Sequence, residues 1–468
     1  MISMCNRSLM SRAVKQGVVL FLLVCLGACA AHEKRYYITP SLIQGTQPKM
    51  TTPGFWTGLI EEPDEVIIPA YAIESFNASV RRETGKIKDI SQYAATYNGG
   101  LLKNTFSSTL ESWAGRRSFD IQGERVQAGF FDKISSNMNL AGIPEKVNVC
   151  FGIVTAYSNQ RILPTDSGMY AGKVNHAFDR LQNSALDIGT PLAILHWTSD
   201  KKWLYADSPL CSGWLPAQNV GLCSREQLIH YTGAEPFVVT LPAKTDLFLD
   251  EDLRRHHAYV RMGTRFVSKP DNGKGVVEIL LPLRSPDGSC LFMGGFVAET
   301  ALHHGYLPYT PRTIITQAFA MLNAPYGWGG MYGEQDCSRF IQEIFATVGI
   351  HLPRNSTQQA KVGMMAALFE ENMPAPQRSA ALFEHALAGI SILQMRGHVM
   401  LYLGFFEGEP YAIHDMWGYL EPDSDGERLR VTNRVVVTDL SPGSGTSSGS
   451  LLERLRVVRV VDADKLNQ

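Results

Sequence analysis

The stretch Asp336-Cys-Ser-Arg-Phe-Ile-Gln-Glu-Ile-Phe-Ala-Thr-Val-Gly349 decides the fold of the C-terminal third of this chain. Its apolar residues recur at the spacing of one helix face: Phe340, Ile341, Ile344, Phe345 and Val348. Asp336 is a good N-cap residue, and Gly349 is a suitable residue for the end of a helix. We therefore predict a helix that begins at Asp336 and carries Cys337 in its first turn.

The segments around this helix predict a mixed α+β domain. Upstream, Thr310 is expected to cap a helix that has Pro311 at its first position. Downstream, the pattern changes to the alternation typical of strands in four stretches: residues 398–403, 411–414, 434–437 and 455–460. The serine- and glycine-rich stretch 441–450 between the last two is expected to be a flexible loop. The domain is thus predicted to hold helices first and an antiparallel sheet after them.

Cys337 lies where a cysteine can act as a nucleophile. The N-terminal end of a helix favours an anion, so this position is expected to lower the pKa of the thiol. A cysteine nucleophile also needs an imidazole to take its proton, and His398 and His414 begin and end neighbouring predicted strands. A lone cysteine or histidine is more often a buried structural residue, but the three together favour catalysis.

Four short motifs carry a resemblance to a known family. They are Tyr326-Gly-Trp-Gly-Gly330, Asp336-Cys337-Ser338, Gly397-His398-Val399 and Ile413-His414. Together they resemble the NlpC/P60 family of papain-like cysteine peptidases, over residues 305–468. The resemblance implies a papain-like fold, with Cys337 as nucleophile, His398 as general base and His414 as the residue that orients it. It also implies that the hydroxyl of Tyr326 stabilises the oxyanion.

The same resemblance implies a function. Members of the multidomain branch cleave cell-wall stem peptides, so the expected activity is hydrolysis of the γ-D-Glu–diaminopimelate bond. Asp336 and Ser338 match residues that hold the free amine of an N-terminal L-Ala. Two departures concern access to the site: Arg339 stands where many members carry Gly, and residues 361–387 are expected to form a helical insertion. Two other functions stay open, namely a murein-binding adaptor with little or no hydrolase activity and acyl transfer on lipids.

The preceding residues are predicted to form three further parts. Residues 29–150 form an N-terminal stabilising region, in which 70–84 is expected to be helical and Gly99-Gly100 marks a break. Residues 151–234 and 235–304 each show short β-rich runs separated by turns, such as residues 285–288, which predict two small barrels. The first resembles bacterial SH3 modules, and the resemblance of the whole arrangement to the multidomain branch implies that the second is such a module too. It is expected to cover one end of the substrate groove, with Tyr205 as a candidate contact.

The N-terminus has the order of an export signal. Arg7, Arg12 and Lys15 precede an apolar run that ends in Leu26-Gly-Ala-Cys29. This ending resembles the lipobox of bacterial lipoproteins, so residues 1–28 are expected to be a signal peptide and Cys29 to be acylated. Since Ala30 follows, the resemblance places the protein in the cell envelope, lipid-anchored at the periplasmic face of the outer membrane. A short apolar run of this kind is not expected to span a bilayer.

Composition and charge exclude further classes of protein. The chain has 468 residues, of which 45% are hydrophobic and 19% charged, as in ordinary soluble globular proteins. With 43 basic and 45 acidic residues the net charge is −2, so no basic field favours nucleic acid. His256-His257 and His303-His304 have no acidic partner at ligand spacing, so we expect neither a metal site nor a cofactor.

Overall fold

The computed structural model describes residues 41–173, 176–270 and 273–462 of the chain. Apart from Ser41, these residues belong to one compact unit that begins at Leu42. The predicted signal peptide and the predicted lipidation site Cys29 lie outside the described residues. Within the part that is described, no helix has both the length and the apolar character needed to cross a membrane.

The N-terminal region is more helical than the sequence predicts. Its helices are α2 (Pro53–Thr57), α3 (Ala70–Thr84), α4 (Gly99–Ala114) and α5 (Ala128–Asn137), and β1 (Thr96–Asn98) pairs with β2 (Lys146–Asn148). The helix predicted over 70–84 is confirmed. Gly99-Gly100 begins α4 instead of marking a break, because the Asn98 side chain accepts a hydrogen bond from the Leu101 N–H and caps the helix.

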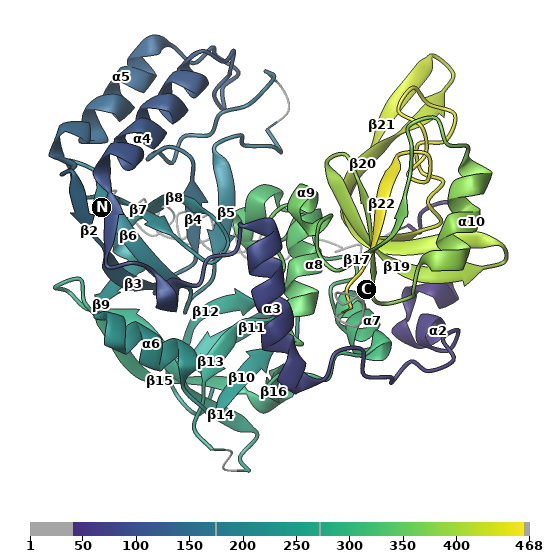
Figure 1. Ribbon diagram of the computed structural model, residues 1–468, viewed down its shortest axis with the longest axis horizontal. Coiled ribbons are helices and arrows are strands. Elements are labelled where there is room, and N and C mark those ends of the chain that lie inside the picture. Colours follow the sequence, from purple (N-terminus) through teal and green to yellow (C-terminus); the bar gives the residue numbers. More distant parts are fainter. Residues whose placement is uncertain (1–40, 174–175, 271–272, 463–468) are drawn as a thin grey trace, which may run out of the picture. The chain divides into compact units, whose positions relative to one another are not determined.

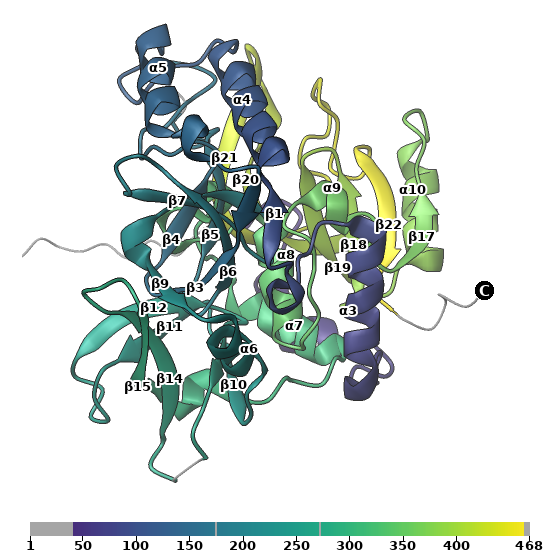
Figure 2. The same ribbon diagram turned by 60° about the vertical axis from the view of Figure 1, so that its left-hand side comes forward.

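The first β unit is a seven-stranded antiparallel sheet with the strand order β5-β4-β8-β7-β6-β3-β9. Its strands are β3 (Cys150–Val154), β4 (Ser158–Arg161), β5 (Gln182–Leu186), β6 (Pro191–Trp197), β7 (Trp203–Asp207), β8 (Ser212–Pro216) and β9 (Val220–Cys223). α4 and α5 cover part of it, as both views show (Figure 1, Figure 2). Trp203 and Trp214 are buried in the apolar core between these helices and the sheet.

The second β unit follows α6 (Arg225–Gly233). It has a three-stranded sheet, β13-β10-β16, and a four-stranded sheet, β12-β11-β15-β14. The strands are β10 (Phe237–Thr240), β11 (Lys244–Phe248), β12 (His256–Arg261), β13 (Arg265–Val267), β14 (Val276–Arg284), β15 (Cys290–Ala298) and β16 (Leu302–His304). The predicted turn 285–288 joins β14 to β15 as a hairpin. The two units agree with the predicted pair of β domains, whereas the likeness of the second to an SH3 module stays a prediction.

The C-terminal domain is a six-stranded antiparallel sheet with helices on it. The strand order is β17-β22-β18-β19-β20-β21. The strands are β17 (Met364–Leu368), β18 (Ser391–Met395), β19 (His398–Phe406), β20 (Glu409–Asp423), β21 (Gly426–Thr438) and β22 (Leu455–Val460). The helices are α7 (Pro311–Ala320), α8 (Cys337–Ala346), α9 (Ser356–Gln359) and α10 (Ala375–His385).

One predicted element of this domain is wrong. The stretch 361–387 is not one helix, because its first half forms the edge strand β17 and only its second half forms α10. β17 pairs with β22, so strand pairing prevails over the helix propensity of the Met and Ala residues there.

Helix α8 lies between the sheet and the two β units (Figure 1). One face packs on the sheet, where Phe340, Ile341 and Ile344 join a core with Val399 and Ile413. This confirms the predicted helix and its apolar face. The helix begins at Cys337 because the Asp336 side chain accepts a hydrogen bond from the Arg339 N–H, 2.9 Å away.

The other face of α8 is joined to both β units by a buried charge cluster, here defined as Asp187, Arg261, Arg339 and Glu343. Arg339 Nη2 lies 3.0 Å from an Asp187 oxygen, and Arg261 Nη2 lies 2.8 Å from the same oxygen. Within α8, Arg339 Nε lies 2.7 Å from Glu343 Oε1. Arg339, which departs from the family pattern, therefore ties the helix of Cys337 to the first β unit.

Candidate active site

Cys337 is the first residue of α8 and is 7% exposed. The backbone N–H of Val399, the residue that follows His398 on β19, lies close enough to the sulfur to lower the pKa of the thiol. The structure thus brings the predicted nucleophile against the strand that begins with the predicted base. The other four described cysteines, Cys150, Cys211, Cys223 and Cys290, lie in the two β units.

The expected lowering of the thiol pKa is wrong. Burial raises the pKa of Cys337, and the nearby carboxyl groups of Asp336 and Asp415 raise it further. The Val399 N–H and Arg354 act in the opposite direction, with smaller effects. Since desolvation outweighs the favourable end of the helix, the resting thiol is neutral, and a base has to remove its proton.

The two predicted histidines are in contact. His398 Nε2 lies 2.7 Å from His414 Nδ1, and His414 Nε2 lies 3.0 Å from the hydroxyl oxygen of Thr438. If His398 is to accept a proton at Nδ1, its own proton must sit on Nε2, which then donates to His414 Nδ1. His414 in turn carries its proton on Nε2 and donates it to Thr438. A single assignment of protons therefore satisfies the hydrogen bonds of His398, His414 and Thr438.

Burial also keeps both imidazoles neutral. It lowers the pKa of His398 to about 3, with Arg454 adding to the effect and Asp336 opposing it. The pKa of His414 is far below its ordinary value, because of burial and the adjacent His398. The thiol and both imidazoles are accordingly neutral at rest. A neutral imidazole is the form that can take up a proton.

The carboxylate of Asp336 is fully occupied by partners in the protein. Oδ1 accepts hydrogen bonds from the Ser338 hydroxyl and the Arg339 N–H, and Oδ2 accepts one from the Gly329 N–H. Arg354 adds a bond to each oxygen, at 3.1 and 2.8 Å. Burial opposes the ionisation of Asp336, but Arg354 and the other donors outweigh it, so its pKa lies below the usual range.

Arg354 is the partner that sequence analysis missed. It also donates to the Ser338 hydroxyl and to the Ser184 hydroxyl of the first β unit. It lies in the connection between α8 and α9, where no periodic pattern distinguishes it. The predicted amine pocket of Asp336 and Ser338 therefore already contains a cation, and its role towards a substrate stays a prediction.

Tyr326 lies at the site in an aromatic group with Phe178, Trp328 and Trp417. Its ring centroid is 6.3 Å from that of Phe178 and 6.1 Å from that of Trp417. Burial raises the pKa of Tyr326, and Cys337, Asp336 and Asp415 add to the effect. Its hydroxyl thus stays protonated and can donate a hydrogen bond.

The first β unit holds the loop that follows Tyr326. Trp328 Nε1 donates to the Asp179 carbonyl at 3.0 Å, Gln182 donates to the Gly329 carbonyl at 3.1 Å, and Tyr157 donates to the Gly330 carbonyl at 2.6 Å. Both glycines are required, since they have φ angles of +62° and +82°, and an added Cβ would lie 2.5 Å from Gln182 or 2.8 Å from Arg261.

The expectation for Tyr205 is wrong. Its ring packs on Phe106 of α4 and on Trp214, with centroid distances of 4.7 and 5.4 Å. It belongs to the core between the N-terminal helices and the first β unit. The residue that this unit brings to Tyr326 is Phe178, in the long connection between β4 and β5.

Asp415 is a second buried acid near Cys337, and sequence analysis did not select it. It follows His414 on β20 and is fully buried, and neither carboxyl oxygen has a hydrogen-bond partner in the part of the chain that the structure describes. Burial raises its pKa well above the ordinary value, and the nearby acids Asp336, Glu343 and Glu334 add to this effect. The available signal in the sequence was an acidic residue at a strand position whose neighbours on the same face are apolar.

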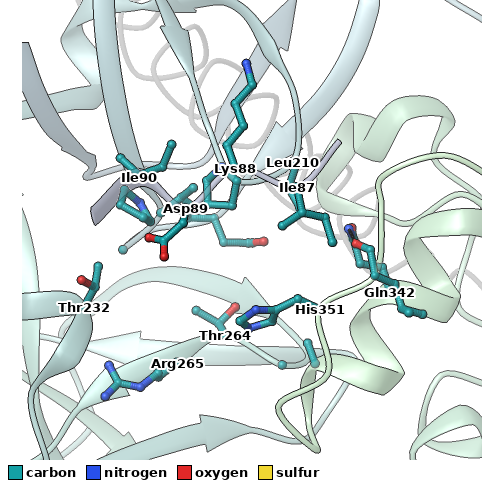
Figure 3. Close-up of a pocket in the computed structure, with 18 of the residues that line it drawn as sticks. Ile87, Lys88, Asp89, Ile90, Leu210, Thr232, Thr264, Arg265, Gln342 and His351 are labelled. Carbon is teal, nitrogen blue, oxygen red and sulfur yellow. Dashed lines mark hydrogen bonds between the residues drawn. The ribbon is translucent and has the colours of Figure 1, made fainter. Parts of the chain in front are cut away.

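A cavity of about 550 Å³ lies elsewhere, between the segment 87–91, the two β units and the outer side of α8 (Figure 3). Asp89 and His351 extend towards it in Figure 3. Its lining includes acids and bases alike and none of the catalytic residues predicted above. The cavity is therefore separate from the candidate active site.

Comparison with known proteins agrees with this geometry. Residues 323–418 match the NlpC/P60 family, and residues 171–216 match the SH3 domain of the SH3b1 type. A gamma-D-glutamyl-L-lysine dipeptidyl-peptidase of Bacillus subtilis (strain 168) is 30% identical over 155 residues, which are 30% of this chain and 50% of that protein. The chain thus matches about half the length of this curated relative.

Two solved structures are similar. An NlpC/P60 endopeptidase from Photobacterium damselae subsp. piscicida has a TM-score of 0.71 at 20% identity, over 91% of this chain and 99% of that one. An NlpC/P60 family protein from Bacillus cereus ATCC 10987 has a TM-score of 0.45 at 17% identity, over 67% and 100% of the two chains. The first shows that the fold extends over nearly the whole chain. With the two sequence matches, it shows that this chain carries an NlpC/P60 family domain preceded by an SH3 domain.

Proposed function

We propose that the chain is a cysteine peptidase that hydrolyses the γ-D-Glu–diaminopimelate bond of peptidoglycan stem peptides. The observation that carries the proposal is that Cys337 lies against the strand that His398 begins, and that His398 starts a hydrogen-bonded series ending at Thr438. A nucleophile, a base and groups that fix the tautomer of the base are the parts that thiol acyl transfer needs.

The mechanism follows from these parts. Nδ1 of His398 takes the thiol proton as the sulfur of Cys337 attacks the γ-carbonyl of D-Glu. The oxyanion is met by backbone N–H groups at the start of α8 and by the Tyr326 hydroxyl. His398 then protonates the departing amine of diaminopimelate, and water hydrolyses the thioester in the second half of the reaction.

The finer specificity is part of the proposal: the substrate has a free N-terminal L-Ala. The first β unit supports this, since it brings Phe178 against Trp328 and holds the loop at Trp328 close to Tyr326. The test compares L-Ala-γ-D-Glu-diaminopimelate with its N-acetylated form. The free peptide should be cleaved with the higher kcat/KM, because the acetyl group adds bulk before the L-Ala. Equal kcat/KM for the two peptides would point to a hydrolase of intact wall.

The proposal places the enzyme at the membrane surface through acylated Cys29, in the cell envelope at the periplasmic face of the outer membrane. Its support is the sequence Leu26-Gly-Ala-Cys29 after an apolar run. Acyl chains contribute about 0.8 kcal/mol per buried CH₂, enough for durable anchoring when several are attached. Incorporation of a labelled fatty acid tests it: Cys29→Ser should abolish the label, and an equally labelled variant would refute the anchor.

The central experiment incubates the protein with defined muropeptides and identifies the products by mass spectrometry. The wild-type protein should release free L-Ala-γ-D-Glu, and Cys337→Ala should release none. If the wild-type protein binds murein and cleaves nothing, the adaptor function holds instead.

A further inference from the structure

Asp415 stands on the side of the sheet that faces α8. Side chains alternate along a strand, and Ile413, two residues earlier on β20, packs in the core with the apolar face of α8. Asp415 therefore points to the α8 side. The carboxyl group influences both Cys337 and Tyr326 electrostatically.

The neighbouring segment brings Tyr326 to the same place. Val435 of β21 pairs with Asp415 in the strand register, and its backbone N–H and C=O bond to Ala324 and Asn323. The chain continues from there to Tyr326, whose ring lies beside Trp417, two residues after Asp415. The thiol, the tyrosine and this carboxyl group thus come together from three elements.

The described residues provide no hydrogen bond to the carboxyl group of Asp415, although its side chain is fully buried. An unsatisfied buried polar group costs about 1–3 kcal/mol, so its presence calls for a partner that arrives with the substrate. The titratable groups that influence its pKa are Asp336, Glu343 and Glu334, and Asp415 in turn influences Cys337 and Tyr326. The nearby acids disfavour its ionisation, and Arg354 is bound to Asp336.

We propose that Asp415 is a further catalytic residue, whose neutral carboxyl group donates a hydrogen bond to the carbonyl oxygen that Cys337 attacks. This inference rests on the proposed acyl-transfer chemistry. As the C–S bond forms, the carbonyl π electrons move to oxygen, where the O–H of Asp415 and the O–H of Tyr326 meet the negative charge. Asp415 keeps its proton throughout. When the intermediate collapses, the C–N bond breaks and the amine takes its proton from His398. A protonated carboxylic acid can serve in this way where its surroundings keep it neutral.

The test separates attack on a carbonyl from attack on a saturated carbon. Acylation of Cys337 by p-nitrophenyl acetate passes through an oxyanion, whereas alkylation by iodoacetamide displaces iodide without one. Both are measured on the full chain by mass spectrometry of the Cys337 peptide, for Asp415→Ala, for the near-isosteric Asp415→Asn and for Asp425→Ala, a control at the exposed turn of the same hairpin. Thermal unfolding checks that each variant is folded.

Asp415→Ala should slow acylation by about 10²–10³-fold, the usual cost of one oxyanion donor, and leave alkylation unchanged. Asp415→Asn, which retains an N–H donor, should lose less, and Asp425→Ala nothing. Unchanged acylation in Asp415→Ala, a parallel loss of both reactions, or an Asn variant as slow as the Ala variant would each overturn the proposal. A wild-type protein that is acylated at Cys337 but cleaves no muropeptide would refute the proposed substrate and still test Asp415. A wild-type Cys337 that is not acylated would overturn both.

Discussion

The start of α8 and the nearby stretch of β20 each bury a carboxyl group close to Cys337, and the two groups differ in their hydrogen bonding. Asp336 receives hydrogen bonds from Gly329, Ser338, Arg339 and Arg354. Asp415 receives none from any described residue. A buried charge that is paired on every side maintains the local structure, whereas an unpaired polar group retains its bonding capacity for a ligand.

This difference distinguishes the residues that maintain the structure of the site from the residues that we propose to take part in the reaction. Asp336 and Arg354 fix the start of α8, and the charge cluster fixes its outer face. Cys337 and Asp415 have no such network. Four predictions test the division, from the largest expected effect to the smallest.

Removal of the proposed nucleophile should have the largest effect on activity, whereas removal of a cysteine in the β units should have none. Cys337→Ala should lower turnover of the stem peptide by about 10⁶-fold, the cost seen when a nucleophile is removed. Cys150→Ala, in the exposed position at the start of β3, should have no effect. Rates of product release by mass spectrometry give the comparison. An active, folded Cys337→Ala protein would refute the nucleophile.

The two histidines are expected to differ, although they are in contact. His398 moves the proton, so His398→Ala should cost about 10²–10⁴-fold in kcat. His414→Asn replaces only an orienting hydrogen bond and should cost less. Steady-state kcat of the folded variants measures both. Equal or reversed losses would exchange the two roles.

Removal of the charge at each buried carboxyl group should affect stability unequally. Asp336→Asn leaves the Arg354 guanidinium buried without its counter-charge, so it should lower the free energy of unfolding by about 3–5 kcal/mol. Asp415→Asn removes no hydrogen bond to a described residue and removes a buried acid whose pKa is raised, so it should not lower the free energy of unfolding at pH 7. Urea unfolding at pH 7 measures the two values, and similar losses would remove the distinction drawn here.

The same two acids should give opposite slopes of stability against pH. The pKa of Asp336 is lowered in the folded protein, so its contribution is present above its unfolded pKa of about 3.9 and is lost as pH falls. The pKa of Asp415 is raised, so its contribution is present below about pH 3.9 and is lost as pH rises above it. As pH falls from about 4 to about 2, wild type should therefore lose stability relative to Asp336→Asn, and as pH rises from about 4 to about 7 it should lose stability relative to Asp415→Asn. Unfolding curves at several pH values check the signs.

Periodicity and motif spacing predicted the elements that present the candidate catalytic groups. The apolar face from Phe340 to Val348 predicted α8, and alternation predicted β19 and β20, so Cys337, His398 and His414 were placed correctly on their elements. Thr438 and Arg354 were not found, because each acts through a contact distant in sequence that no local pattern records. The direction of the thiol pKa was wrong for a related reason: burial depends on packing, which the helix position alone does not reveal.

The charge cluster at Asp187, Arg261, Arg339 and Glu343 limits how the domains can be exchanged by recombination during evolution. The helix that presents the nucleophile is also the helix that closes the contact with both β units. Exchange of either unit for an unrelated module would leave Arg339 or Glu343 in a buried contact without its partner, which is strongly destabilising. Recombination at the connecting segments therefore yields a stable protein only when the incoming module brings matching charges. The three domains are expected to pass between genomes as one block.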